Sequence, residues 1–103
     1  MKANIKNMNK ITFSILSADK ILIPDYMEHY SKGQVEKLVK HFDASKLAPL
    51  VVSYRDDKYF VVDGQSRLVA LRAMYGEKVR LPVQVIAGLT LEQEMQNYHT
   101  HWD

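Results

Sequence analysis

Residues 61–75 read Val-Val-Asp-Gly-Gln-Ser-Arg-Leu-Val-Ala-Leu-Arg-Ala-Met-Tyr, and this stretch decides the fold more than any other part of the chain. Its first residues end a β-branched apolar run, which predicts a strand that closes at Val62. A short polar turn follows. From Ser66 the apolar spacing is that of a helix, which ends at Tyr75 because Gly76 is a typical C-terminal cap. The stretch therefore predicts a strand, a tight turn and a helix in direct succession.

The turn places an arginine, Arg67, in the first turn of the predicted helix, where a cation is unusual. A helix N-terminus carries unpaired N–H groups and a partial positive charge, so it favours anions. Arg67 and these amides would converge on a bound phosphate or carboxylate, and Gly64 would permit a close approach or a positive φ. The plainer alternative is a solvated Arg67 beside Asp63 as an ordinary N-cap.

The flanking sequence predicts further strands and helices. The predicted strands cover 11–16, 21–24, 49–54, 58–62 and 81–86, and the predicted helices cover 31–42, 66–75 and the segment from Thr90 onward. Residues 55–58 form the turn of a hairpin between two of these strands. The elements indicate an α+β domain, a small mixed or antiparallel sheet with packed helices. Residues 1–10 are polar and are expected to form a flexible N-terminus ahead of a single domain at 11–103.

Two predicted helices begin with a capping box, Ser31 with Gln34 and Thr90 with Gln93. The apolar faces expected to pack are Val35, Leu38, Val39 and Phe42 in the first helix, Leu68, Leu71 and Tyr75 in the second, and Leu91, Met95, Tyr98 and Trp102 in the last. The last helix has no stop signal before Asp103. It is expected either to dock on its own domain or to pack on another copy, or the chain is the N-terminal part of a longer protein.

The composition excludes several classes of protein. The 103 residues carry a formal charge of only +2, so tight nonspecific DNA binding by this chain alone is not indicated. No cysteine is present, which excludes disulfides and thiolate chemistry. No apolar stretch approaches the ~20 residues that span a bilayer, and no signal peptide is visible. We therefore expect a cytoplasmic protein with no membrane partner.

The order of these segments resembles a known family. The matching features are Pro24 after a short strand, the Pro-Leu-Val-Val segment at 49–52, the hairpin, residues 59–70 and the strand at 81–85. Together they resemble the ParB N-terminal domain of the ParB/sulfiredoxin superfamily, known also as the ParB-like nuclease domain, over roughly residues 20–98. The most specific element is Gly64-x-x-Arg67-x-x-Ala70, which is similar to the phosphate-binding box of that family.

The resemblance implies a nucleotide-binding module associated with plasmid or chromosome partition or with gene regulation. In ParB this turn holds the triphosphate of CTP, so the implied ligand is CTP or ATP with Mg²⁺. The implied phosphate-binding residues are Asp63, Gly64, Gln65, Ser66 and Arg67, with Asp63 capping the helix or holding Mg²⁺. DNA would be a partner through additional domains or an oligomer, with a homodimer as one such state. No metal cluster in the sequence supports nuclease activity.

Departures from the superfamily leave the activity open. Related kinases carry Asp-Gly-His-His-Arg and sulfiredoxins Gly-Gly-Cys-His-Arg, whereas Gln65 and Ser66 stand at the middle positions here. Because the chain lacks cysteine, sulfiredoxin chemistry is excluded. One alternative is an ATP-dependent small-molecule kinase or NTPase with Asp63 and Glu28 as candidate catalytic residues. Another is a protein-interaction domain without a ligand.

Two other groups of residues are not expected to form sites. His99 and His101 point about 200° apart on a helix, so with Asp103 they do not make a metal site. Arg72 lies about 140° around the helix from Arg67, so it is not expected to be a second phosphate ligand.

Overall fold

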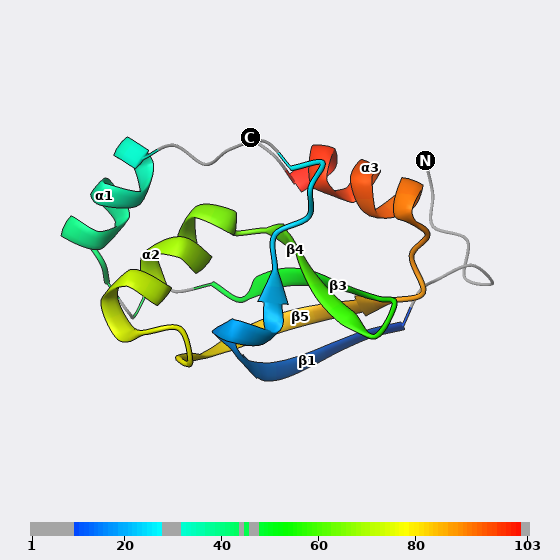
Figure 1. Ribbon diagram of the computed structural model, residues 1–103, viewed down its shortest axis with the longest axis horizontal. Coiled ribbons are helices and arrows are strands. Elements are labelled where there is room, and N and C mark those ends of the chain that lie inside the picture. Colours follow the sequence, from blue (N-terminus) through cyan, green and yellow to red (C-terminus); the bar gives the residue numbers. More distant parts are fainter. Residues whose placement is uncertain (1–9, 28–31, 44, 46–47, 102–103) are drawn as a thin grey trace.

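The computed structural model describes residues 10–27, 32–43, 45 and 48–101, with the side chains of 97–101 outside the description. In this part of the chain, three α-helices pack on a five-stranded mixed sheet, which confirms the α+β prediction (Figure 1). The elements are β1 Lys10–Ser17, the 3₁₀ turn η2 Ala18–Lys20, β2 Ile21–Leu22, α1 Lys32–Lys40, β3 Leu50–Arg55, β4 Lys58–Asp63, α2 Gln65–Tyr75, β5 Arg80–Ala87 and α3 Leu91–His101. The first strand begins at Lys10, one residue before the predicted domain boundary.

The sheet has the strand order β1-β5-β3-β4-β2. The pairs β1–β5 and β3–β4 are antiparallel, and β3–β5 and β2–β4 are parallel. The predicted hairpin joins β3 to β4, and its turn residues Asp56 and Asp57 have φ of 54° and 61°. Positive φ at both central residues is the type I′ geometry that matches strand twist. The hairpin makes β3 and β4 neighbours, so the end of β4 lies beside the start of β3.

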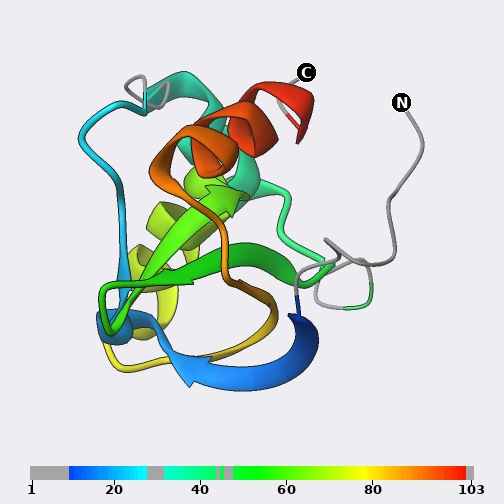
Figure 2. The ribbon, with the colours of Figure 1, turned by 90° about the vertical axis from the view of Figure 1, so that its right-hand side faces the viewer.

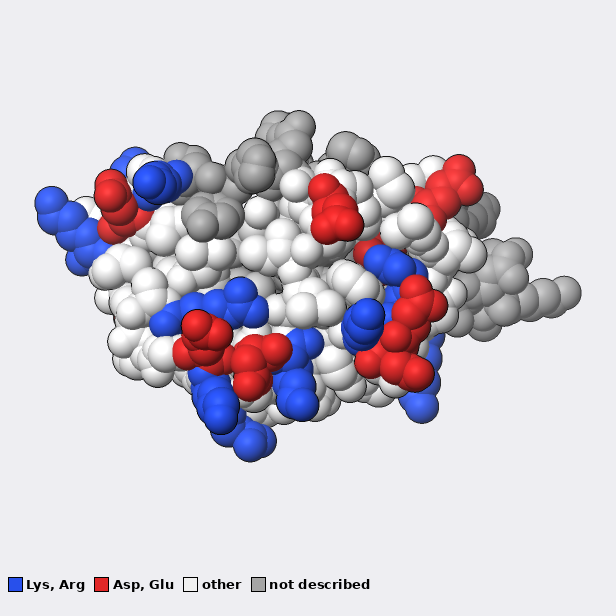
Figure 3. All heavy atoms as spheres, in the orientation of Figure 1, with Lys and Arg blue, Asp and Glu red and all other residues white. Residues whose placement is uncertain are grey.

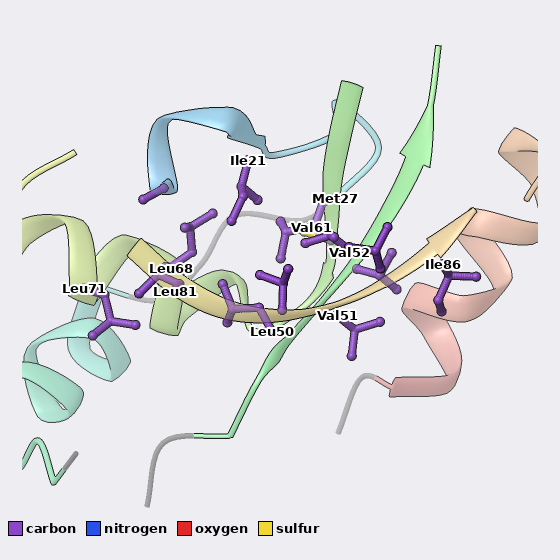
Figure 4. Packing of buried hydrophobic residues seen from close by; sticks show 14 of the residues in the cluster. Ile21, Met27, Leu50, Val51, Val52, Val61, Leu68, Leu71, Leu81 and Ile86 are labelled. Carbon is purple, nitrogen blue, oxygen red and sulfur yellow. The ribbon is translucent and has the colours of Figure 1, made fainter. Parts of the chain in front are cut away.

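The helices occupy two ends of the sheet. Helices α1 and α2 lie together at one end, and α3 lies at the other (Figure 1). The buried core between them is aliphatic, with Leu50, Val52, Val61, Leu68 and Val83 each at most 1% exposed (Figure 4). Because α2 contributes Leu68 to this core immediately after the turn, packing fixes the orientation of the first helical turn.

In two helices, fewer residues of the predicted apolar face are buried than the sequence spacing indicated. Helix α1 ends at Lys40, so Phe42 lies beyond the helix that the sequence predicted to reach it. Val35, Leu38 and Phe42 are half-buried, but Val39 is exposed, so the prediction that Val39 packs on this face was wrong. In α2, Tyr75 is 58% exposed, and its ring meets the ring of Phe42 edge-on with centroids 6.0 Å apart. Helix α1 therefore packs on α2 as an outer layer, and neither helix is buried around its whole circumference.

Helix α3 begins with the predicted capping box. The Thr90 amide donates to Oε1 of Gln93 at 3.0 Å, and the Gln93 amide donates to Oγ1 of Thr90 at 3.1 Å. The predicted apolar face was wrong in part, since Leu91 is 49% exposed and the helix buries Glu94 completely. The side chains of Tyr98 and Trp102 lie outside the described residues, as does Ser31 of the other predicted capping box.

No helix within the described residues is long and apolar enough to cross a membrane.

Candidate functional site

The turn between β4 and α2 has the geometry that the sequence predicted for Gly64. Its φ of 102° and ψ of 21° are left-handed, a conformation that side chains disfavour. A Cβ atom at Gly64 would collide with Cδ2 of Leu50 and lie 2.9 Å from Nη2 of Arg67. Glycine is therefore required both by the backbone and by the space between the start of β3 and the Arg67 side chain.

The N-terminus of α2 is not capped by a side chain. The first helical hydrogen bond runs from the Leu68 amide to the Gly64 carbonyl at 2.8 Å. The Ser66 and Arg67 amides precede this bond and have no acceptor within the helix. Gly64 occupies the N-cap position, so the expectation that Asp63 caps the helix was wrong: Asp63 is still the last residue of β4. The turn thus presents N–H donors at the positive end of the helix dipole.

Arg67 lies beside this turn and links α2 to the end of β4 and to the loop before β3. Its Nη1 donates to the Ala48 carbonyl at 2.7 Å, and its Nη2 lies 3.7 Å from Oδ2 of Asp63. The side chains of Arg67 and Asp63 are 26% and 39% exposed, so the ion pair is solvated and contributes little, up to about 1 kcal/mol. Arg67 is therefore a fixed but weakly neutralised cation beside the uncapped amides.

A hollow of about 160 Å³ opens between α1 and α2 next to Arg67. Its lining consists of Leu38, His41, Phe42, Asp43, Arg67, Ala70 and Leu71. At Asp43, the hydroxyl and amide of Ser45 donate to the carboxylate at 2.6 and 3.0 Å and lower its pKa, so Asp43 is ionised at neutral pH. The hollow is mostly apolar and has one cation, Arg67, at its boundary with the turn.

A second polar cluster lies at the opposite end of the sheet, where sequence analysis had not expected one. The Arg55 guanidinium donates through Nε to Oε1 of Glu94 at 2.9 Å and through Nη2 to Oε2 at 3.1 Å. The Tyr26 hydroxyl donates to Oε2 at 2.6 Å, and the Phe60 ring centroid lies 4.2 Å from Cζ of Arg55. The charged pair is thus forked, stacked on an aromatic ring and closed off from water on the Glu94 side.

The protonation state of Glu94 follows from opposing effects. Burial raises its pKa, but hydrogen bonds from Arg55 and Tyr26, together with the Arg55 charge, outweigh burial and hold the pKa below the ordinary value of 4.5. Glu94 is charged and satisfied, which is the pattern of a structural ion pair that anchors α3 on β3.

The structure separates the remaining candidates from the turn. Arg72 donates through Nη2 to the Ala18 and Ile21 carbonyls at 2.7 and 2.6 Å, so it holds the β1–β2 connection. Glu28 lies outside the described residues, as do Asp103 and the side chains of His99 and His101. Among the residues that are described, no three His, Asp or Glu side chains gather as metal ligands.

The sheet order and helix placement define a ParB/sulfiredoxin-like fold, as the resemblance implied. The C-terminally truncated ParB of Caulobacter crescentus, complexed with CTP-gamma-S, matches with a TM-score of 0.69 and 15% identity, over 84% of this chain and 50% of that one. A Pnob8-like ParB-N domain matches with a TM-score of 0.60 and 19% identity, over 90% and 36%. Sulfiredoxin from Arabidopsis thaliana matches with a TM-score of 0.57 and 14% identity, over 85% and 97%.

Within this fold class, the chain belongs to the family of unknown function DUF6551, which matches residues 24–100. No curated protein matches it. The chain spans half of the Caulobacter ParB structure, and at these identities the similarity shows a shared fold and not a shared activity.

Proposed function

We propose that this protein is a ParB-like nucleotide-binding module in which the turn from Gly64 to Arg67 holds the phosphates of a nucleoside triphosphate. The observation that carries the proposal is the weakly neutralised Arg67 guanidinium beside a left-handed glycine and an uncapped helix N-terminus. Backbone amides at a helix N-terminus, the helix dipole and an arginine fork each favour the binding of phosphate.

Each residue of the turn has a distinct part in this proposal. Arg67 would exchange its contacts to the Ala48 carbonyl and Asp63 for charge-assisted bonds to phosphate oxygens. Gly64 lets the backbone approach the ligand, and Ser66 and Gln65 add neutral donors. Asp63, released from Arg67, is the carboxylate available to a Mg²⁺ ion, which usually binds through one or two carboxylates plus phosphates.

The hollow between α1 and α2 supports a nucleotide in preference to free phosphate. Its volume of about 160 Å³ is close to the ~150 Å³ of an apolar cavity that holds benzene, so it suits a single six-membered ring. Phe42 and Leu38 offer the apolar lining, and Arg67 borders the turn. A pyrimidine such as that of CTP is therefore the preferred base, and ATP is the alternative. The Caulobacter ParB structure, which contains CTP-gamma-S, is in line with this preference.

DNA enters the proposal as an indirect partner. Another structure of the Caulobacter ParB is complexed to the centromeric parS site, with a TM-score of 0.62 to this chain at 13% identity. On the face drawn in Figure 3, however, the basic side chains of the described residues are interspersed with acidic ones. Because the net charge of the chain is only +2, it offers little electrostatic attraction to DNA. We therefore propose that the protein binds DNA through additional domains or as an oligomer, in partition or gene regulation.

A second candidate function is a protein-interaction domain without a ligand. It is favoured by the contacts that Arg67 already makes, because the 2.7 Å bond to Ala48 gives the guanidinium a structural role. The uncharged Gln65 and Ser66 point the same way. A kinase or NTPase is supported by no described contact, since Asp63 lies beside Arg67 and Glu28 is outside the described residues.

Isothermal titration calorimetry with CTP, ATP and inorganic phosphate, each with and without Mg²⁺, tests the proposal. Arg67→Gln should weaken triphosphate binding by more than about tenfold, because charge-assisted bonds contribute roughly 1.5–3 kcal/mol. Arg67→Lys keeps the charge without the forked geometry, so its triphosphate affinity should lie between those of the wild type and Arg67→Gln. Arg80→Gln removes an equal charge from the exposed start of β5 and should bind like the wild type.

Two results would decide against the proposal. If no triphosphate binds the wild type, the interaction-domain function is favoured. If a triphosphate binds with the same affinity to Arg67→Gln and to Arg80→Gln, the ligand lies elsewhere on the molecule.

A further inference from the structure

The edge strand β1 exposes a row of large apolar side chains. It lies on the side of the molecule away from α1 and α3 (Figures 1 and 2). Ile11, Phe13 and Ile15 alternate along it and are 47%, 72% and 57% exposed. Alternation with period two places the three side chains on one face of the sheet. Within the described residues, β1 pairs only with β5, so its other edge carries backbone groups with no strand beside them.

This edge lacks the features that prevent the sheets of two molecules from pairing edge to edge. Natural edge strands are kept short, bulged, or protected by proline or charge. The pairing of β1 with β5 runs from Lys10 to Ser17 without a register shift, and residues 11–17 contain neither proline nor a charged side chain. The opposite edge shows the contrast, because β2 has only two residues and is soon followed by Pro24. The β2 edge of the sheet is therefore protected against pairing with another strand, and the β1 edge is not.

We propose that β1 pairs antiparallel with β1 of a second copy of this chain, to give a continuous sheet across a two-fold axis. The sequence of the strand is self-complementary for this pairing. With Phe13 opposite the partner's Phe13, Ile11 lies opposite the partner's Ile15, and Thr12 lies opposite the partner's Ser14. Paired residues share a face in an antiparallel sheet, so the apolar residues of both copies meet and no like charges are opposed.

The exposed area indicates how strong this association is. A large side chain offers roughly 150–250 Å² when fully exposed, so the three residues present roughly 300–400 Å² in each copy. Together the three side chains of both copies offer about 700 Å² of surface to bury, not counting the backbone edge. This area is somewhat below the ~1,000 Å² buried in a stable interface. The backbone edge adds the ladder hydrogen bonds that β-augmentation uses. The dimer is therefore weak and depends on protein concentration.

Sedimentation equilibrium of the full chain tests the proposal between about 1 and 500 μM, the range of weak interfaces. The wild type should shift with concentration from the chain mass of 11.9 kDa towards twice that mass. Phe13→Glu should raise the dissociation constant by more than about tenfold, because it opposes like charges on the axis and removes the paired rings. Leu91→Glu changes another exposed apolar residue, 49% exposed at the start of α3, and should associate like the wild type.

The proposed register, in which residue 13 of one copy pairs with residue 13 of the other, can be tested with opposite charges. Phe13→Lys alone should be monomeric, and an equimolar mixture of Phe13→Lys with Phe13→Glu should regain the dimer, because residue 13 meets residue 13 across the axis. Thermal unfolding verifies that each variant is folded, and Ile15→Glu replaces Phe13→Glu if that variant is not. A wild type that stays monomeric at about 500 μM, a Phe13→Glu variant that dimerises with the wild-type dissociation constant, or a mixture that fails to associate would each overturn the proposal.

Discussion

Removing Arg55 should destabilise the protein severely and reverse the pH dependence that Glu94 gives it. The wild-type pair is forked, at 2.9 and 3.1 Å, and the Glu94 side chain is completely buried. Arg55→Leu leaves that carboxylate without its counter-charge. Breaking a buried pair in this way costs about 3–5 kcal/mol, a large part of the ~5–15 kcal/mol that holds a domain together. The stacking of Arg55 on Phe60 is lost as well.

The sign of the pH effect separates this mechanism from a loss of packing. In the wild type the pKa of Glu94 is lowered, so its stabilisation is complete above the ordinary value of 4.5 and is lost as the pH falls through the folded pKa. In Arg55→Leu, burial prevails and raises the pKa of Glu94. Protonation then relieves the buried charge, so the variant should gain stability between pH 7 and 5, by up to about 1.4 kcal/mol per pH unit.

Urea unfolding followed by circular dichroism at several pH values measures both effects. The double variant Arg55→Leu/Glu94→Leu is the control, because replacing both partners by apolar residues is often neutral. It should recover most of the lost stability and show no gain on acidification. A cost below about 1 kcal/mol for Arg55→Leu, or an Arg55→Leu variant whose stability falls with pH as the wild type does, would refute the reasoning.

Three further substitutions test the local geometry by chemical denaturation. Gly64→Ala should cost about 1–3 kcal/mol and more than Gly76→Ala, because both glycines have positive φ but only Gly64 is crowded, by Leu50 and Arg67; equal costs would contradict this. Thr90→Ala should cost about 1 kcal/mol through the loss of the α3 cap, and an unchanged midpoint would argue against the cap. Arg72→Met should cost roughly 1–3 kcal/mol, since two carbonyls lose their donor, and a neutral result would mean that water replaces it.

Local signals predicted most of the fold correctly. The order of strand, glycine turn and helix at 61–75, the hairpin turn at 55–58 and the capping box at Thr90 each depend on residues adjacent in sequence. Such signals act through backbone conformation and nearby hydrogen bonds, so a single sequence contains them fully. The left-handed Gly64 belongs to this class.

Asp63 as the helix cap was a local error of one position, but the other failures at the two polar sites share a different cause, which is contact between distant segments. Arg55 and Glu94 are 39 positions apart, and nothing in either neighbourhood shows that they meet. Periodicity assigned Leu91 to a buried face of α3, but the structure buries Glu94, because Arg55 makes a charged residue tolerable in the core. The contact from Arg67 to Ala48, across 19 positions, was unpredictable for the same reason, and it bears most directly on the proposed function.

The two proposed surfaces are far enough apart to be tested separately. The strand order places β5 and β3 between β1 and β4, so the turn after β4 lies about 14 Å from the proposed dimer edge at the usual strand spacing. Pairing through β1 therefore leaves the turn at Gly64 uncovered in both copies. Phe13→Glu should not change nucleotide affinity, and Arg67→Gln should not change association. If either variant affected both, the strands between the two surfaces would have to transmit a conformational change, and independent binding would give way to allosteric coupling between nucleotide and dimer.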